Sequence, residues 1–558
     1  MSGLRAPGLG PIVGHTTDTS SRIWIRAGDP GDENATLDAD RRTLAIIAVV
    51  SENGQPLPEH KIGVHYFRLR REFDRTGTFT LGEDTGIKES KVSYKLKPDT
   101  LYGVRVGTLT LDDPFKNDAN IKSVDLADVL PDPAVWRKPL LDLDERFSAA
   151  EFRTFPAADA GKRDVKVSFL LGSCRYPGLL WKAKLADKIF GPVRAEAEVA
   201  REGGRPSFVL MVGDQIYADK LNRHIPIGLA DTYAEFQERY LTAFGSGNMR
   251  KLLRSLPTYM ILDDHEIEDN WHQDRLRDSA LARLFNLAIG AYMSYQWNHG
   301  PRSFGQRLFY NFACGGLPFF VLDTRTQRYM DDIADSLADN HMLGRPSLAD
   351  EEPNQLDYLL KWLKDAQRTL GNTPKFIASS SVFVPNPMDA RADASLAHKQ
   401  NSDSWPAFPE TRRVILQTIV DHSIQNVVFL SGDIHCSNIA QLSFSGTPKA
   451  KKLKALSITS SAFYWPFPFA DGSPSDYVHD SAAAGQEDTF IISEKPRLAM
   501  DYTAWNFTQV DNFCRVDVDR NNATLTVRVF DDEGKQAIKL RNDGTPVLLE
   551  HKFELEKW

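Results

Sequence analysis

The sequence predicts a mixed α/β fold with a smaller all-β region at its amino terminus. From about residue 165 onward, apolar strand-like runs alternate with helical segments, as in α/β proteins whose sheets are flanked by helices. Residues 10 to about 155 instead hold short, partly alternating apolar segments separated by Gly, Asp, Asn and Pro, a spacing typical of a β-sandwich. We therefore expect a sandwich domain and linker over residues 1–157, followed by a catalytic domain with C-terminal strands over 158–558.

Six segments are the expected strands of the amino-terminal region. In the last of them Tyr102 follows the Pro-containing turn LKPDT, and this stretch resembles the late-strand pattern of fibronectin type III-like domains. The region is thus predicted to be a fibronectin type III-like sandwich. The six segments cover residues 21–27, 44–50, 65–73, 77–82, 91–96 and 101–111.

Three later segments show helical periodicity, covering residues 231–245, 279–297 and 353–371. Asp231 or Thr232 is the candidate N-cap of the first, and Pro353 and Gly371 bound the third. The middle segment is apolar over much of its circumference, so we expect it to be well buried. Near the carboxyl terminus, FCRVDVDRNNATLTVRVFDDEGK predicts an antiparallel hairpin turning at Arg520–Asn522.

Five apolar segments of the second region run directly into polar residues that bind metals or carry charge. Such segments, bounded by Gly and acidic turns, indicate strands buried on both faces, so their polar ends should meet at the carboxyl edge of one sheet. Open α/β sheets bind ligands at that edge. Thiol, carboxylate, phenol and imidazole groups suit a metal centre, which predicts a metal-dependent hydrolase. The residues are Cys174, Asp214, Tyr217, Asp263, Asp264, His265, Asp323, Asp433 and His435.

The segment GDQIYAD supplies Asp214 at a strand end and Tyr217 three residues later. A carboxylate can bridge two cations, and a phenolate is a hard anionic donor that favours a trivalent ion such as Fe(III). The alternative is an Asp that caps the next turn and a Tyr that belongs to the core.

The segment ILDDHEIEDNW concentrates acids after a buried strand. Carboxylates this dense repel one another by several kcal/mol unless a cation neutralises them, which is the physical reason to infer one. A solvated acidic loop with N-caps is the alternative, but the apolar TYMIL before the segment and Trp271 at its end favour a buried site.

Asp433 and His435 are two residues apart and share one face of a strand, so both can reach one ion. Cys436 should point to the opposite face, into the core. Cys174 ends its strand at the same position as the aspartates and is a candidate thiolate ligand, although a free Cys is more often a small buried hydrophobe. The four cysteines form no C-x-x-C pair, so buried free thiols are expected for most of them.

An ordered set of motifs across residues 168–440 resembles the PhoD-type alkaline phosphatase and phosphodiesterase family of the metallophosphoesterases. The motifs are GSC, GDQIYAD, LDDHEIEDNW, LDTRTQR, DSWPAFP and SGDIH. The GDxxY element is also similar to that of purple acid phosphatases. The resemblance implies a metallophosphoesterase core and hydrolysis of phosphomonoesters or phosphodiesters by a metal-activated hydroxide.

The resemblance also implies a binuclear or multinuclear centre with Fe(III) and a divalent ion, Ca(II) in the best-known relatives. The resemblance assigns Cys174, Asp214, Tyr217 and Asp433 to the ferric ion, with Asp214 bridging. Asp264, Asn270 and His435 are the candidates for the divalent site. Whether Asp264 or Asn270 is the ligand stays open, since Asp269 stands before Asn270 where many relatives carry a second Asn.

Three further residues are candidates for the chemistry itself. His265 is placed to protonate the leaving oxygen or to bind phosphate. Arg175 and Arg325 could clamp phosphate with two parallel hydrogen bonds. For each Arg the alternative is an ion pair with a neighbouring carboxylate, and Asp323 is the obvious partner of Arg325.

Two irregular segments are rich in aromatic residues. Trp405 and Phe408, within 381–413, could cover the site or anchor their own loop. The second segment, SSAFYWPFPFADG, would suit an apolar or ring-bearing leaving group, or a domain interface. Its aromatic residues include Phe463, Tyr464 and Trp465.

The overall composition limits the partners of the protein. A net charge of −8 over 558 residues argues against a nucleic-acid or anionic-membrane surface. No signal peptide or membrane span is visible, so a soluble, cytoplasmic protein is expected, or a secreted or periplasmic one if a leader has been removed. The expected partner is a small phosphate ester or a phospholipid. The alternatives are a phospholipase D-like or nucleotide phosphodiesterase and a catalytically degenerate binding protein, and the oligomeric state stays open.

Overall fold

The structure is a computed structural model of the chain. It describes residues 3–28, 42–82, 94–111, 126, 130–158, 166–178, 183–219, 228–330, 337–345, 352–388, 404–467, 473–484, 489–541 and 543–558.

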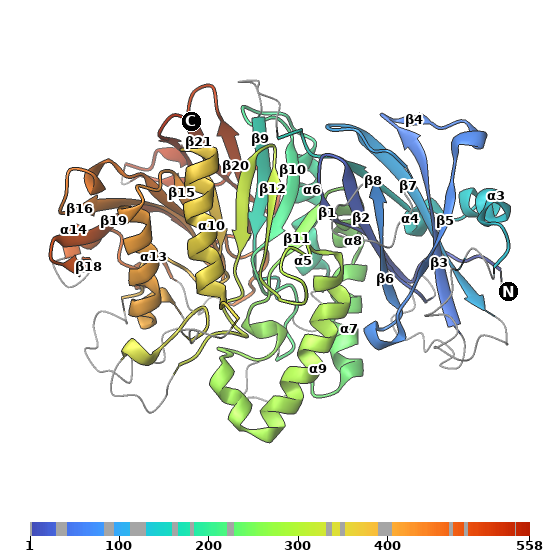
Figure 1. Cartoon of the computed structure of the whole chain (residues 1–558), viewed down its shortest axis with the longest axis horizontal. Coiled ribbons are helices and arrows are strands. Elements are labelled where there is room, and N and C mark those ends of the chain that lie inside the picture. Colours follow the sequence, from blue (N-terminus) through green and yellow to red (C-terminus); the bar gives the residue numbers. More distant parts are fainter. Residues whose placement is uncertain are drawn as a thin grey trace.

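Two antiparallel sheets form the amino-terminal region, drawn in blue in Figure 1. One has the order β1-β2-β6, and the other has the order β4-β3-β7-β8 with β5 paired to β3. Ile23 and Ile25 of the first sheet pack with Ile47 and Val104 of the second in one buried cluster. The strands are β1 (Leu9–Thr16), β2 (Ser20–Arg26), β3 (Arg42–Glu52), β4 (Gln55–Pro56), β5 (Val64–Arg68), β6 (Thr76–Gly82), β7 (Leu101–Leu111) and β8 (Ala149–Arg153).

Five of the six expected strands are therefore present. The sixth, over residues 91–96, is described only in part: residues 91–93 lie outside the described part, and Tyr94 to Leu96 are not in a strand. The Tyr102 hydroxyl accepts a hydrogen bond from the Lys97 backbone N–H at 2.9 Å, so the tyrosine holds the turn that precedes its own strand.

A six-stranded sheet has the order β11-β10-β9-β20-β21-β24. Its first three strands are parallel, and β20, β21 and β24 add antiparallel strands. The expected carboxyl-terminal hairpin is confirmed, because β20 ends at Asp519 and β21 begins at Thr524. The strands are β9 (Lys166–Gly172), β10 (Pro206–Met211), β11 (Thr258–Met260), β20 (Asn512–Asp519), β21 (Thr524–Asp531) and β24 (Glu550–Glu554).

An eight-stranded sheet has the order β12-β13-β14-β15-β17-β16-β19-β18, with β13, β14, β15 and β17 parallel. The two large sheets pack face to face through aromatic rings: Phe169 of β9 lies 5.4 Å, centroid to centroid, from both Phe319 of β13 and Phe376 of β14. The strands are β12 (Tyr310–Cys314), β13 (Leu317–Val321), β14 (Lys375–Ala378), β15 (Val427–Ser431), β16 (Ser437–Ser445), β17 (Ala455–Thr459), β18 (Phe490–Glu494) and β19 (Arg497–Thr508).

Helices cover the outer faces of both sheets, giving four layers and confirming a mixed α/β fold (Figure 1). α10 (Gln355–Leu370) and α13 (Pro409–Asp421) pack on the eight-stranded sheet. The helices on the six-stranded sheet are α6 (Phe190–Ala197), α7 (Tyr233–Gly245), α8 (Gly247–Leu253) and α9 (Ser279–Tyr295).

The three predicted helices all form. Thr232 is the N-cap of α7 and makes a capping box with Glu235, and Gly371 is the C-cap of α10. The expectation that α9 is well buried is wrong for its amino-terminal half, where Leu284 is the one residue before Ala288 classed as buried. Apolar residues over much of the circumference of a helix therefore did not require burial here.

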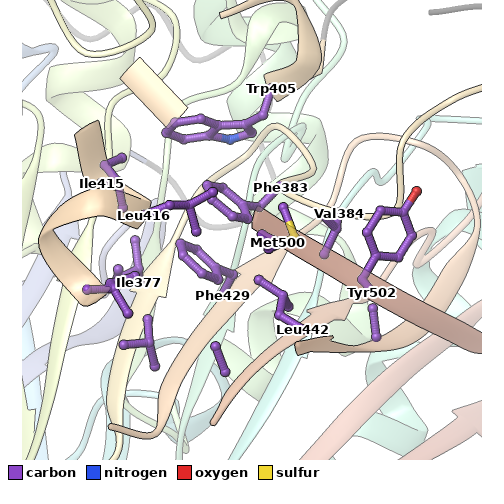
Figure 2. Packing of buried hydrophobic residues seen from close by; sticks show 14 of the residues in the cluster. Ile377, Phe383, Val384, Trp405, Ile415, Leu416, Phe429, Leu442, Met500 and Tyr502 are labelled. Atoms are coloured by element: carbon purple, nitrogen blue, oxygen red, sulfur yellow. The ribbon is translucent and has the colours of Figure 1, made fainter. Parts of the chain in front are cut away.

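The aromatic residues of the loop before α13 pack in the hydrophobic core between the eight-stranded sheet and its helices. Trp405 is fully buried, and its ring centroid lies 5.0 Å from that of Phe383 (Figure 2). The Phe383 ring stacks in turn on Phe429 of β15, with a centroid distance of 3.7 Å. Phe408 is buried in the same cluster. These two aromatic residues thus anchor the loop. Residues 389–403 of the expected loop lie outside the described part of the chain.

Within the described residues, none of the helices combines the length and the apolarity needed to span a bilayer. All four cysteines are free and buried, as expected, and Cys436 belongs to the hydrophobic cluster under α10 and α13.

Candidate metal centre

The polar strand ends come from two sheets, so the expectation of one sheet is wrong. β9, β10 and β11 belong to the six-stranded sheet, whereas β13 and β15 belong to the eight-stranded sheet. The carboxyl ends of both sets meet because the two sheets approach closely after β15. A Cβ atom on Gly432 would lie 2.3 Å from Ser173 Oγ, so this position requires glycine.

Five candidate ligand residues adopt left-handed backbone conformations in the turns after their strands. Their φ angles are 57° at Cys174, 55° at Asp214, 55° at Asn270, 72° at Asp433 and 49° at His435. Such conformations are uncommon for residues other than glycine and cluster at functional sites. The alternation argument for Asp433 and His435 is therefore wrong, since both lie in a turn beyond the end of β15.

The turns bring potential ligand atoms together in three overlapping groups. Within each group, the ligand atoms lie within 4.8 Å of one another. Asp214 belongs to all three, which gives it the central position. The groups are Cys174, Asp214 and His435; Asp214, Asp264 and His265; and Asp214, Asp263, Asp264 and Asp433.

Asp214 is buried and only partly satisfied by hydrogen bonds. Its Oδ2 accepts a hydrogen bond from the Tyr217 hydroxyl at 3.3 Å, while its Oδ1 accepts none from any described residue. Burial raises the pKa of Asp214 well above its ordinary value, and the nearby Cys174 and Asp263 raise it further. A buried carboxylate oxygen in this state lacks a positive partner.

Cys174 and Tyr217 both lie next to the Asp214 carboxylate. Burial raises the pKa of the Cys174 thiol to about 12, and burial together with Asp214 raises the pKa of Tyr217 well above its ordinary value. The Tyr217 hydroxyl also lies 3.3 Å from His435 Nε2. Without a cation both side chains stay protonated at neutral pH, so only a bound cation would make them anionic ligands.

Arg325 is fully buried beside the carboxylates. Its Nε lies 2.5 Å from Asp263 Oδ1, and its Nη2 lies 3.5 Å from an oxygen of Asp264 and of Asp433. Asp323 serves the turn instead, because its Oδ1 accepts the backbone N–H groups of Arg325 at 3.2 Å and of Thr326 at 2.9 Å.

His265 has a carboxylate partner that the sequence interpretation missed. His265 Nδ1 lies 2.7 Å from Asp219 Oδ1, and the imidazole stacks on the Tyr217 ring at 4.3 Å. Burial lowers the pKa of His265, but Asp219, Asp264 and Asp214 outweigh it and raise the pKa well above the ordinary value. Asp219 ends the GDQIYAD segment, so its place in that segment was the available signal.

Glu266 is a second residue that the sequence interpretation missed. Its carboxylate accepts backbone N–H groups from Asp214 at 3.2 Å, Gln215 at 2.7 Å and Asp263 at 2.9 Å. One buried side chain therefore fixes the turns after β10 and β11 relative to each other. The signal was the spacing of Asp263 and Glu266, which form a capping box.

Two predicted site residues lie apart from the cluster. The Asn270 side chain is exposed, although its backbone N–H donates to Asp264 Oδ2 at 2.6 Å. Arg175 directs its guanidinium to Ser246 Oγ at 3.2 Å and over the Phe190 ring at 5.8 Å. The structure thus brings Arg325 to the carboxylates but does not bring Arg175 there.

The donor set fits a centre of one or more cations. It combines clustered buried carboxylates with an Asp214 oxygen that accepts no hydrogen bond from the described residues. It also includes a soft donor, the Cys174 thiol, and a hard donor, the Tyr217 phenol, which stay protonated without a cation. Carboxylate, imidazole and thiolate together are compatible with iron and with several divalent ions.

Comparisons with known proteins relate the chain to one family. A family model described as "PhoD-like phosphatase" matches residues 181–524. Alkaline phosphatase D of Bacillus subtilis (strain 168) is 26% identical over 216 residues, which cover 37% of this chain and 36% of that protein. A solved structure described as "Structure of PhoD" aligns with a TM-score of 0.62 and 15% identity, covering 94% of this chain and 86% of that one, and so shares the fold.

Proposed function

The chain belongs to the PhoD-like phosphatase family, and from that premise we propose that it hydrolyses phosphate esters at the cluster around Asp214. The curated relative is matched over only about a third of its length, 36%, so the activity rests on the family and on the site. The observation that carries the proposal is the central position of Asp214 in all three groups of potential ligands.

We propose two cations that share Asp214. Cys174, Tyr217 and His435 would hold Fe(III) together with Asp214, and Asp264 and Asp433 would hold a divalent ion, Ca(II) by family resemblance; the grouping of Cys174 and His435 with Asp214, and of Asp264 and Asp433 with Asp214, supports this division. The resemblance alone pairs Asp433 with the ferric ion, and His435 and Asn270 with the divalent ion. The grouping of Cys174, Asp214 and His435 favours placing His435 on the ferric side. Such cations lower the pKa of water and neutralise charge on phosphoryl oxygens.

His265 is the proposed proton donor to the leaving oxygen. Its Nδ1 is held by Asp219, which leaves Nε2 for the substrate, and the surrounding carboxylates favour the protonated imidazole. A positioned general acid contributes roughly 10²–10⁴ in rate. Arg325 remains the candidate phosphate-binding arginine, because its guanidinium lies on the cluster.

The amino-terminal region is proposed to be a fibronectin type III-like module that ends near residue 157. Its two packed antiparallel sheets and the hydrogen bond from Lys97 to the Tyr102 hydroxyl support this assignment, since a conserved Tyr that bonds to upstream backbone is typical of related sandwiches.

The test is to measure metal content together with hydrolysis of p-nitrophenyl phosphate and bis(p-nitrophenyl) phosphate. We expect bound iron and a divalent ion, with activity that is lost on chelation and restored by adding the metals back. A protein that stays inert on both esters after incubation with Fe(III) and Ca(II) would contradict the proposal. Metal binding without hydrolysis would instead favour a degenerate binding protein, and hydrolysis of the diester alone would favour a phosphodiesterase.

A further inference from the structure

Trp465 lies directly on the imidazole of His435. The two ring centroids are 3.5 Å apart and the rings are inclined by 13°. We infer that Trp465 is a positioning residue that fixes the His435 ring for metal binding. The inference rests on the proposed function, because it assumes that His435 is a metal ligand.

The backbone holds Trp465 in place through the segment that follows β17. Tyr464 N–H donates to the carbonyl of Cys174 at 3.2 Å, and Tyr176 N–H donates to the carbonyl of Tyr464 at 3.1 Å. Trp465 N–H donates to Asp511 Oδ1 at 3.0 Å. The residues before Trp465 therefore run beside the turn that carries Cys174.

Aromatic neighbours support the indole from other directions. The ring of Trp465 makes edge contacts with Tyr176 at 5.5 Å and with Phe467 at 5.1 Å. Such contacts restrict rotation of the indole about its side-chain bonds. The indole therefore forms a fixed wall against one face of the His435 imidazole.

The Trp465 indole restricts the His435 imidazole to one plane. The backbone N–H of His435 donates to Ser461 Oγ at 3.0 Å, and its Nε2 faces the Tyr217 hydroxyl at 3.3 Å, next to Cys174 and Asp214. With the backbone held and one ring face covered, the plane of the imidazole is fixed, and within that plane Nε2 lies against the Tyr217 hydroxyl. Outer-shell residues that orient a metal-binding His typically change metal affinity by about 10- to 100-fold.

Two variants separate ring stacking from bulk. Trp465→Phe keeps an aromatic plane over His435, whereas Trp465→Leu keeps apolar volume and removes the plane. Trp505→Leu is the matched control, because Trp505 contacts a different histidine, His551, outside the site. The ring centroids of Trp505 and His551 are 4.8 Å apart. The metal-free full-length proteins are titrated with Co(II), whose visible absorption reports both affinity and ligand geometry.

We expect Trp465→Leu to weaken Co(II) binding about tenfold or more and to change the absorption spectrum. Trp465→Phe should restore binding to within about threefold, and Trp505→Leu should match the wild type. Equal affinity and spectra for Trp465→Leu and wild type would overturn the inference while leaving the proposed function intact. A third outcome is that the wild type binds Co(II), Trp465→Leu binds it more weakly, and the wild type hydrolyses no phosphate ester. This outcome would overturn only the proposed function. Wild-type protein that binds no Co(II) would overturn both.

Discussion

His265 Nδ1 and Asp219 Oδ1 lie 2.7 Å apart, and the Asp219 side chain is fully buried. The same carboxylate accepts the backbone N–H of Asp269 at 2.7 Å through its other oxygen. Asp219 thus ties the His265 ring to the turn that follows it, so the carboxylate both orients the imidazole and stabilises its charged form.

Asp219→Asn should lower the rate most for substrates with poor leaving groups, because those substrates need a proton from His265. Since general acids contribute roughly 10²–10⁴, we expect kcat/KM to fall about 10- to 100-fold on an alkyl phosphate and far less on p-nitrophenyl phosphate. The exposed Asp231→Asn at the start of α7 is the control. Equal losses on both substrates would refute a role through proton donation.

Asp214→Asn should have opposite effects on stability with and without metal. In chelator the variant should be more stable than wild type, because an unsatisfied buried carboxylate oxygen costs roughly 1–3 kcal/mol and an amide can donate to the neighbouring acids. With metal present it should be less stable and inactive. Thermal unfolding in both conditions measures this.

Asp323→Asn is the matched control for Asp214→Asn. Asp323 is also a buried aspartate just after a strand, but its carboxylate accepts backbone N–H groups from its own turn. It should lose stability in both conditions. If Asp214→Asn behaves in the same way, Asp214 is a turn cap and the bridging assignment fails.

Tyr217→Phe should remove any visible tyrosinate-to-iron absorption from the iron-loaded protein while leaving the fold intact. The hydroxyl is the atom nearest to Asp214 and His435, and phenylalanine keeps the ring that stacks on His265. Tyr176→Phe is the control, since its ring lies 5.1 Å from Tyr217. Colour that survives in Tyr217→Phe and disappears in Tyr176→Phe would transfer the ligand role to Tyr176.

Local sequence patterns predicted the elements of this chain but not their sheets. Helical periodicity with Pro353 and Gly371 predicted α10, and periodicity with Asp231 or Thr232 as the N-cap predicted α7, because these signals lie within or beside one helix. Nothing in a buried apolar run states which sheet it joins, so β13 and β15 were expected in the same sheet as β9. Only long-range packing, such as Phe169 against Phe319, separates the two sheets.

The same limit applied to the site. Residue type and position after a strand identified Asp214 and Tyr217 as neighbours. For Arg325 the alternative to a phosphate clamp was an ion pair with the nearby Asp323, whereas its guanidinium lies on Asp263, which is 62 residues away in the chain. Partners of buried charges are set by tertiary contacts, which a single sequence does not encode locally.

We expect the protein to lose stability in mild acid because of His299. This residue is fully buried, and burial together with Arg22 and Arg302 lowers its pKa to about 3. The unfolded chain, with a histidine pKa of about 6.5, binds the proton first, so stability is fully present above that pH and falls by up to about 1.4 kcal/mol per pH unit below it. His299→Leu should reduce the difference between urea midpoints at pH 7.5 and pH 5.5, whereas the exposed His422→Leu should not. An unchanged difference in His299→Leu would show that other groups cause the acid sensitivity.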